Sequence, residues 1–278
     1  MTKANDTQSA TKPEEERILL TRNSPFNSIV ATDDGTGMIT LHFGDDEVIQ
    51  SIVKLGHPKH LELSYARVIP SCLAFTGTPQ RLLIVGLGGG TLPLFFHSLF
   101  PELQIDVVEI DAVVVEVAKM QCGFFEDSRM RVLVEDGRDF IERSGSLYDV
   151  IILDSFSNDS IPQHLLTAEF LAAVRTRLAE GGIAVANVWA RTRNPLFDDM
   201  LRTYLEVFED LYLLDVPDRT VKLFVAIPRK QFVTRDTLIR RTREFSEYRS
   251  LPQDPVESVS TVTRADVGMV LAARVLRD

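Results

Sequence analysis

Four groups that could hold a nucleoside follow short apolar runs of the chain. The turn Gly86-Leu87-Gly88-Gly89-Gly90 comes first, and glycines there let the backbone turn tightly and approach a ligand closely. Glu109 ends the next apolar run, where a carboxylate can accept hydrogen bonds from both hydroxyls of a ribose. Asp136-Gly137 ends the third run, where the acid can accept a bond from an adenine amine. Asp154 ends the fourth run and could hold an attacking amine and take its proton.

A single acid at the end of a strand could equally be a helix cap, and we expect Asp111 to be one. Four such groups in register are better explained by a nucleoside site. Nicotinamide dinucleotide is the competing ligand, but its fingerprint needs a third glycine-like residue at the position of Thr91. It also gives no role to Asp136 or Asp154. The sequence therefore favours an adenosyl nucleoside.

Alternating strand and helix patterns from residue 81 onward supply the elements that must position these groups. Near-continuous apolar strands are expected in a parallel sheet that helices cover on both faces. The carboxyl ends of such strands meet at one edge, so all four groups should face one crevice. The predicted strands are 82–85, 105–109, 130–134, 150–154, 183–188 and an antiparallel pair at 211–216 and 221–227, and the predicted helices are 92–99, 113–121, 138–142, 168–178 and 196–208.

The two ends of the chain show different patterns. β-rich runs at 27–32, 38–43 and 47–53 predict a small antiparallel sheet, and an amphipathic helix is expected at 61–75. Weaker helical patterns are found near the other end, at 234–245 and 264–276. The predicted divisions are a disordered tail at 1–17, a small β region plus helix at 18–76, a Rossmann-like nucleoside-binding domain at 77–228 and a helical appendage at 229–278.

The composition is that of an acidic globular protein. With 30 Lys and Arg against 40 Asp and Glu, the net charge of −10 argues against nucleic-acid or anionic-membrane partners, which require clustered cations. Cys72 and Cys122 are expected to be reduced and buried, and neither they nor the five histidines show metal-ligand spacing. No apolar run is long enough to span a membrane, and residues 1–17 lack the apolar stretch of a secretion signal. We therefore expect a cytoplasmic location.

Several short motifs resemble those of one known family. They are the turn at 86–92, Val108-Glu109-Ile110-Asp111, Asp136-Gly137, the segment 148–155, and the segment 162–166 that leads into Thr167-Ala168-Glu169-Phe170. In this order and spacing they resemble the polyamine aminopropyltransferases, the spermidine synthase family, over nearly all of the chain. The resemblance implies an α/β fold with a class I methyltransferase-like sheet of seven strands, the last antiparallel. It also implies a small N-terminal β domain, an S-adenosyl donor and usually a homodimer.

The nucleoside half of the family pattern carries over, whereas the polyamine half departs from it. The family's turn has an Asp that holds the ammonium group of the donor, and Gly88 stands at that position here. The family's Tyr-His-Glu matches Tyr65-Ala66-Arg67. Its Asp-Ser-(Ser/Thr)-Asp-Pro matches Asp154-Ser155-Phe156-Ser157-Asn158, which keeps the first Asp and loses the second. Asp159 could replace the missing acid.

These departures from the family pattern bear on which donor the site would select. An acid beside the donor would attract the bare ammonium of decarboxylated S-adenosylmethionine and would repel the carboxylate of the intact molecule by on the order of several kcal/mol. Gly88 in place of the acid therefore relaxes selection for the decarboxylated donor. Arg67 could pair with the methionyl carboxylate, although it could equally be a surface arginine on a helix.

The leading hypothesis is a transferase that uses S-adenosylmethionine or its decarboxylated form as donor and no metal. Methyl transfer is favoured, with a small-molecule amine or a peptide as an acceptor that the sequence does not identify. Asp154 is the predicted catalytic base, with Tyr65 and Asp159 orienting the acceptor and His164 near the crevice. Two alternatives remain open, namely aminopropyl transfer, as in spermidine synthase, and a non-catalytic nucleoside-binding protein.

Overall fold

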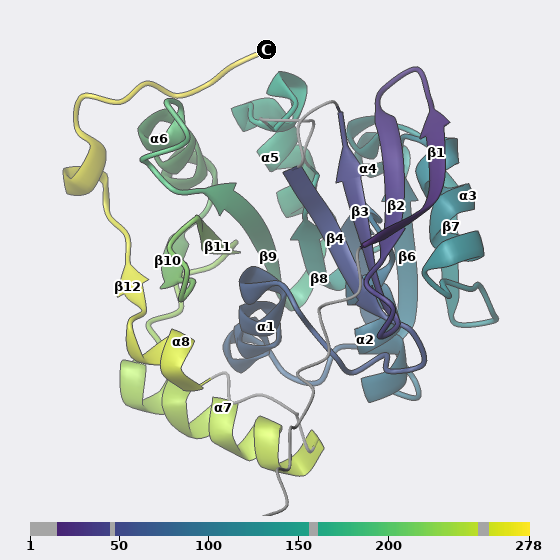
Figure 1. The fold of residues 1–278 in the computed structure, drawn as a ribbon. Coiled ribbons are helices and arrows are strands. Elements are labelled where there is room, and N and C mark those ends of the chain that lie inside the picture. The colour runs from purple at the N-terminus through teal and green to yellow at the C-terminus, as the bar shows by residue number, and fades with distance from the viewer. Residues whose placement is uncertain (1–15, 45–47, 156–160, 250–255) are drawn as a thin grey trace, which may run out of the picture.

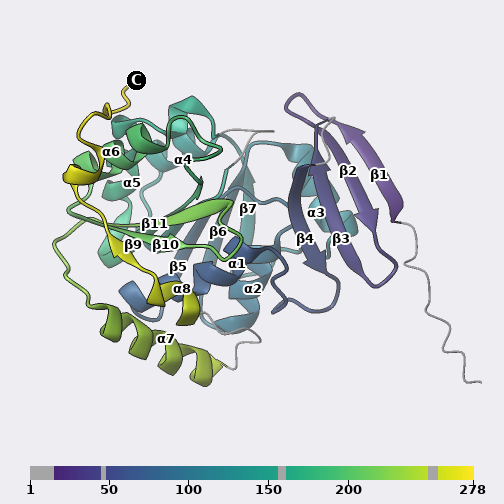
Figure 2. The same ribbon diagram turned by 60° about the vertical axis from the view of Figure 1, so that its left-hand side comes forward.

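Two β-sheets organise the described part of the chain, which is residues 16–44, 48–155, 161–249 and 256–278 of a computed structural model. The larger sheet has the strand order β12-β10-β11-β9-β8-β5-β6-β7, and helices lie on both of its faces (Figure 1). The smaller sheet has the order β1-β2-β3-β4 and stands beside the larger one (Figure 2). The strands are β1 (Arg17–Asn23), β2 (Ser28–Asp33), β3 (Met38–Phe43), β4 (Val48–Lys54), β5 (Arg81–Val85), β6 (Gln104–Glu109), β7 (Met130–Val134), β8 (Tyr148–Leu153), β9 (Leu178–Trp189), β10 (Asp210–Asp215), β11 (Val221–Ile227) and β12 (Thr263–Arg264). The α-helices are α1 (Ser64–Val68), α2 (Thr91–Leu99), α3 (Ala112–Gln121), α4 (Gly137–Arg143), α5 (Ala168–Thr176), α6 (Phe197–Val207), α7 (Arg235–Arg249) and α8 (Val256–Ser260).

Parallel pairing builds the centre of the larger sheet. β5 pairs in parallel with β6 and β8, β6 pairs with β7, and β8 pairs with β9. β11 runs antiparallel between β9 and β10. The predicted α/β fold, a methyltransferase-like sheet of seven strands with the last one antiparallel, is thereby confirmed. The two-residue strand β12 adds an eighth strand at the edge beside β10, which the sequence pattern did not indicate.

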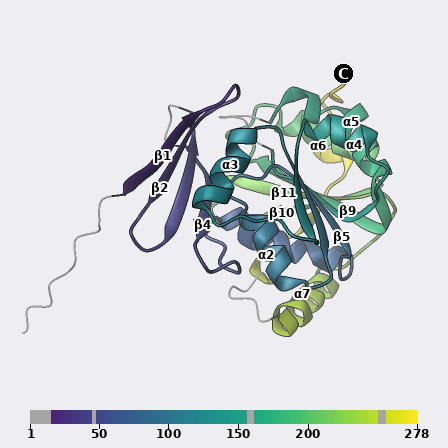
Figure 3. The same cartoon turned by 90° about the vertical axis from the view of Figure 1, so that its right-hand side faces the viewer.

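Alternate side chains of β5 show why this sheet needs helices on both faces. Leu82 and Ile84 pack in one core cluster with α1 and α2, whereas Leu83 and Val85 pack in a second cluster with α4, α5 and α6. A third cluster joins α3 to the inner face of the smaller sheet, so α3 links the two sheets (Figure 3). In the described ranges, no helix is long and apolar enough to cross a bilayer.

The smaller sheet has one strand more than the sequence predicted. Its outer strand β1 begins at Arg17, where a disordered tail was expected to end, and residues 1–15 lie outside the described part of the chain. Side chains of β1 are exposed or half-buried, so the strand lacks the alternation of apolar and polar residues that reveals its neighbours. The expected helix at 61–75 is also interrupted, since α1 gives way to a 3₁₀ helix at Ile69–Phe75. Pro70, which lacks a backbone N–H, stands at the start of that helix.

The last part of the chain follows the prediction only in α7. The helix predicted at 264–276 is wrong, because those residues contribute to β12, a short 3₁₀ helix at Val267–Val270, and an irregular segment that runs past α6 toward α5 (Figure 1). Tertiary contacts override the helical pattern there. The guanidinium of Arg264 pairs with the buried carboxylate of Asp210, and the N–H of Ala265 donates to the carbonyl of Leu211.

Candidate active site

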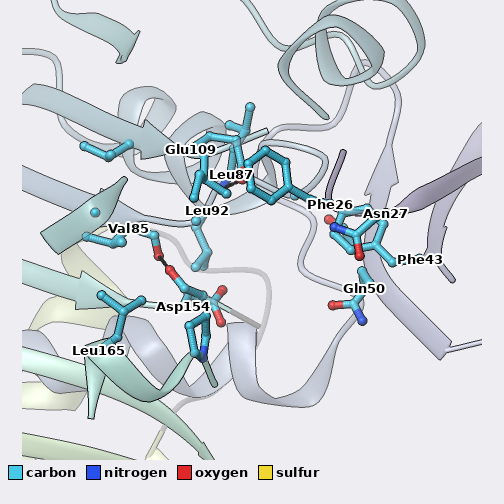
Figure 4. Close-up of a pocket in the computed structure, with 18 of the residues that line it drawn as sticks. Phe26, Asn27, Phe43, Gln50, Val85, Leu87, Leu92, Glu109, Asp154 and Leu165 are labelled. Carbon is cyan, nitrogen blue, oxygen red and sulfur yellow. Dashed lines mark hydrogen bonds between the residues drawn. The ribbon is translucent and has the colours of Figure 1, made fainter. Parts of the chain in front are cut away.

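A cavity of about 340 Å³ opens at the carboxyl ends of the central strands, where the smaller sheet faces them (Figure 4). Seven of the nine predicted site residues line it: Tyr65, Gly86, Gly88, Glu109, Asp136, Gly137 and Asp154. Gly90 is not among the described residues that line the cavity, and Asp159 lies outside the described part of the chain. Glu109 and Asp154 therefore face one common space, as a nucleoside site requires.

The turn after β5 packs tightly against the end of β8 at Gly86. A Cβ atom on Gly86 would lie 2.2 Å from the carbonyl oxygen of Asp154, so any larger residue would separate the turn from the candidate base. Gly90 has a different reason to be small, because a Cβ there would meet the ring of Phe124 at 2.8 Å. Gly86 thus shapes the cavity, and Gly90 allows α2 to pack closely against Phe124.

Glu109 fixes the glycine-rich turn to the second strand of the site. Its Oε2 accepts a hydrogen bond of 2.9 Å from the N–H of Leu87, and its Oε1 accepts one of 3.0 Å from the N–H of Asp111. Burial raises the pKa of Glu109, and these N–H donors oppose the rise. Each oxygen keeps a lone pair that could accept a ribose hydroxyl. Asp111 caps α3 through the N–H of Val113, as the sequence predicted.

The carboxylate of Asp136 has more hydrogen-bond partners within the protein than the sequence suggested. Its Oδ1 accepts from the N–H groups of Arg138 and Asp139 and so caps α4. Its Oδ2 lies 2.9 Å from Nε2 of His164, which also lines the cavity. Contact of Asp136 with an adenine amine therefore stays a prediction, and the arrangement adds an imidazole to that wall.

Asp154 is held by one hydrogen bond on each oxygen. Tyr65 donates its hydroxyl to Oδ2 at 3.0 Å, and Asn187 donates its amide N–H to Oδ1 at 3.0 Å. Burial raises the pKa of Asp154, and these two donors oppose the rise. Burial and the nearby Asp154 raise the pKa of Tyr65 well above its usual value, so its hydroxyl stays protonated and donates. The result is a fixed carboxylate whose free lone pairs could take a proton from an amine.

The sequence reasoning missed Asn187 and the residues of the smaller sheet. Asn187 is 3% exposed and is the one polar residue in the apolar run 183–188, which was a usable signal. The far wall of the cavity, opposite Asp154 in Figure 4, comes from the smaller sheet and the loop before β2. That wall is formed by Phe26, Asn27, Phe43, Gln50 and Ser51.

Arg67 takes no part in the cavity as far as its described lining shows. Its Nε donates to the carbonyl of Leu61 at 2.6 Å, and its guanidinium pairs with Glu62 at 3.3 Å. These contacts agree with the interpretation of Arg67 as a surface arginine on α1, and they give no support to the suggested pairing with a methionyl carboxylate.

Comparison with known proteins identifies the family of this chain. The family model described as "Spermine/spermidine synthase domain" matches residues 62–221. The chain belongs to the spermine/spermidine synthase family. The resemblance inferred from the motifs is thereby confirmed, and the match covers both Tyr65 and Asn187 of the candidate site.

Relatives of this spermine/spermidine synthase family member carry two kinds of transferase name. The polyamine aminopropyltransferase of Vibrio vulnificus is 35% identical over 181 residues, which are 62% of this chain and 60% of the relative. The bovine eEF1A lysine and N-terminal methyltransferase is 41% identical over 147 residues, 49% of this chain and 21% of the relative. The chain thus spans less than two thirds of the length of either relative. A solved structure of human methyltransferase-like protein 13 in complex with SAH is 28% identical, with a TM-score of 0.64, and the match covers 69% of this chain and 95% of that one.

Proposed function

We propose that this family member transfers a methyl group from S-adenosylmethionine to an amine or a similar nucleophile. The observation that carries the proposal is the backbone of Gly88 at the cavity wall, at the position where the family pattern has an acid. Glu109, Asp136 and Asp154 are the acids among the described residues that line the cavity, and each already accepts hydrogen bonds from the protein. The described wall thus has no spare carboxylate beside Gly88 that would repel the carboxylate of intact S-adenosylmethionine.

The same turn suits a carboxylate. Within the described ranges, the N–H groups of Gly88 and Gly89 have no hydrogen-bond acceptor from the protein. They precede the nine-residue helix α2, whose N-cap Gly90 has no side chain to cap it. Free N–H groups at a helix N-terminus attract anions. Intact S-adenosylmethionine has a carboxylate to place there, and the decarboxylated donor does not.

The remaining residues of the cavity fit the chemistry of the transfer. Glu109 would hold the ribose, and the donor would supply the activated carbon–sulfur bond. The attacking nitrogen forms a bond to the methyl carbon as the carbon–sulfur bond breaks, and its proton passes to Asp154. Tyr65 and Asn187 hold that carboxylate in place, so the protein contributes alignment and exclusion of water.

Aminopropyl transfer from decarboxylated S-adenosylmethionine is the second candidate. It is favoured by the names of relatives such as the Vibrio vulnificus protein and by the Tyr65–Asp154 pair, which matches the family pattern. Both reactions would use the same nucleoside site and the same candidate base. They differ in the donor, so the identity of the bound donor distinguishes them.

Calorimetry with the two reaction products tests the donor. We expect S-adenosylhomocysteine to bind at least about tenfold more tightly than 5′-methylthioadenosine, because only the former carries a carboxylate for the free N–H groups of the turn. In assays with a panel of amines, amino acids and peptides as acceptors, we expect turnover with S-adenosylmethionine rather than with its decarboxylated form. Tighter binding of 5′-methylthioadenosine, with turnover of the decarboxylated donor, would establish aminopropyl transfer instead.

The hydrogen bond from Tyr65 gives a prediction for the pH dependence of the reaction. A base must be ionised, so activity should fall as pH drops through the raised pKa of Asp154. Tyr65→Phe removes one donor that lowers this pKa, so the acid limb of the kcat/KM profile should move to higher pH. Tyr148→Phe is the matched control, since it removes a similar bond to Asp106 away from the cavity. An acid limb that stays in place in Tyr65→Phe, or moves equally in both variants, would refute the assignment.

A further inference from the structure

Residues 271–278, here named the return segment, pack against α5 and α6, two helices on the side of the candidate site. The carbonyl of Leu276 accepts from the N–H of Ala168 at 2.9 Å, and the N–H of Leu276 donates to Oγ1 of Thr203 at 2.9 Å. The N–H of Arg274 donates to Asp199 at 2.8 Å. Figure 1 shows this segment passing α6 and ending near α5. Main-chain bonds to α5 and α6 therefore fix its course.

Asp278 binds the return segment to α4, the helix whose first residue, Gly137, lines the cavity of the candidate site. Arg138 binds it with both ends of its guanidinium, at 2.6 Å to Oδ1 and 2.5 Å to Oδ2, and the hydroxyl of Thr167 donates to Oδ1 at 2.7 Å. These contacts, Arg138 first, lower the pKa of Asp278 to about 2, so the carboxylate stays ionised at neutral pH. The geometry is that of a bidentate arginine–carboxylate pair, which is directional as well as attractive.

Arg138 connects Asp278 to residues that line the cavity. The same Nη1 that binds Asp278 also donates to the carbonyl oxygen of His164 at 3.2 Å. The imidazole of His164 bonds in turn to Asp136, and Pro162, His164 and Leu165 line the cavity. Arg138 itself directly follows Asp136-Gly137 in the sequence. An unbroken series of polar contacts therefore joins Asp278 to the side of the cavity opposite the smaller sheet.

We infer that Arg138 and Asp278 are positioning residues that hold the 162–165 wall of the nucleoside site in its binding conformation. Neither side chain is among the described residues that line the cavity, so both act through His164. The inference rests on the proposed binding of an adenosyl nucleoside, but not on the choice between methyl and aminopropyl transfer. It predicts that a substitution at residue 278 changes the affinity for the nucleoside.

Asp278→Asn tests this with a matched control on the same segment. We expect the variant to bind both S-adenosylhomocysteine and 5′-methylthioadenosine about five- to tenfold more weakly, because both carry the adenosine that this wall would contact. Arg138→Lys should resemble it, since lysine keeps the charge but loses the fork that spans Asp278 and His164. Arg277→Gln removes ion pairs to Glu169 and Glu206 from the same segment without touching Arg138, and its affinities should stay within about twofold of the wild type.

Hydrogen exchange provides a measurement that needs no ligand. The amides of Leu165 and Leu166 donate to Pro162 and Gln163, so they report on the order of the wall. Their exchange should accelerate several-fold in Asp278→Asn and stay unchanged in Arg277→Gln. Equal effects of the two variants would mean that Asp278 only helps to dock the segment, and the inference would fail. No effect of Asp278→Asn would also overturn the inference. If the wild type binds no adenosyl compound, the proposed function fails, and exchange alone still decides whether Asp278 orders the wall.

Discussion

Replacing Asp154 by Asn is expected to lower kcat by about 10²- to 10⁴-fold, the usual contribution of a positioned general base. Asn has nearly the same shape and can still accept the hydrogen bond that Tyr65 donates, but it cannot take a proton from the attacking nitrogen. The dissociation constant of S-adenosylhomocysteine should change less than about threefold, because Glu109 and the glycine-rich turn would hold that ligand. Single-turnover kinetics and calorimetry on the same preparation measure both quantities.

A second buried aspartate provides the control for Asp154. Asp106 accepts from the hydroxyl of Tyr148 at 2.7 Å and from Arg131 at 2.6 Å, away from the cavity. Asp106→Asn should lower the melting temperature while leaving kcat of the folded protein unchanged. If Asp154→Asn keeps kcat near the wild-type value, Asp154 is no base in this reaction, and the acceptor must lose its proton elsewhere.

The sequence predicted the main sheet because its strands are buried on both faces. Leu82 to Val85 and Val150 to Leu153 are unbroken apolar runs, and such runs separated by helical patterns leave few alternatives to a parallel sheet. Parallel pairing then places the residues that follow β5, β6 and β8 at one edge. The shared cavity of Gly86, Glu109 and Asp154 follows from that geometry, so three segments distant in the sequence could be assigned to one site.

The rest of the site depends on tertiary packing that no local pattern encodes. Phe26 and Gln50 reach the cavity because α3 packs against the smaller sheet, and that contact joins residues far apart in the sequence. Asp278 likewise meets Arg138 across 140 positions of the chain. Asp136 shows a different limit, since the motif did not reveal that both of its oxygens already have partners in the protein, and its contact with an adenine amine stays a prediction. Local motifs thus located the candidate site, and tertiary contacts decided which of its atoms already have partners in the protein.

In the proposed function the backbone of Gly88 lies beside the carboxylate of the donor, so a negative charge placed at this residue should strongly weaken donor binding. Gly88→Asp is expected to weaken binding of S-adenosylhomocysteine by on the order of a hundredfold. The physical reason is repulsion between two carboxylates, which amounts to about 4 kcal/mol at 4 Å for an effective dielectric constant near 20 and to less in an open, salt-screened cavity. 5′-Methylthioadenosine, which has no carboxylate, should lose little affinity.

A neutral variant separates this charge from the strain of adding a side chain. Gly88 has a φ of 53°, a left-handed conformation that Asp and Asn tolerate better than most residues. A Cβ there would lie 3.2 Å from Cβ of Ser51, which requires a shift of a few tenths of an ångström in either variant. Gly88→Asn therefore has the same steric cost as Gly88→Asp without the charge, and calorimetry with both ligands isolates the electrostatic part. If the two variants bind S-adenosylhomocysteine equally, no donor carboxylate lies beside this turn, and methyl transfer loses its main support.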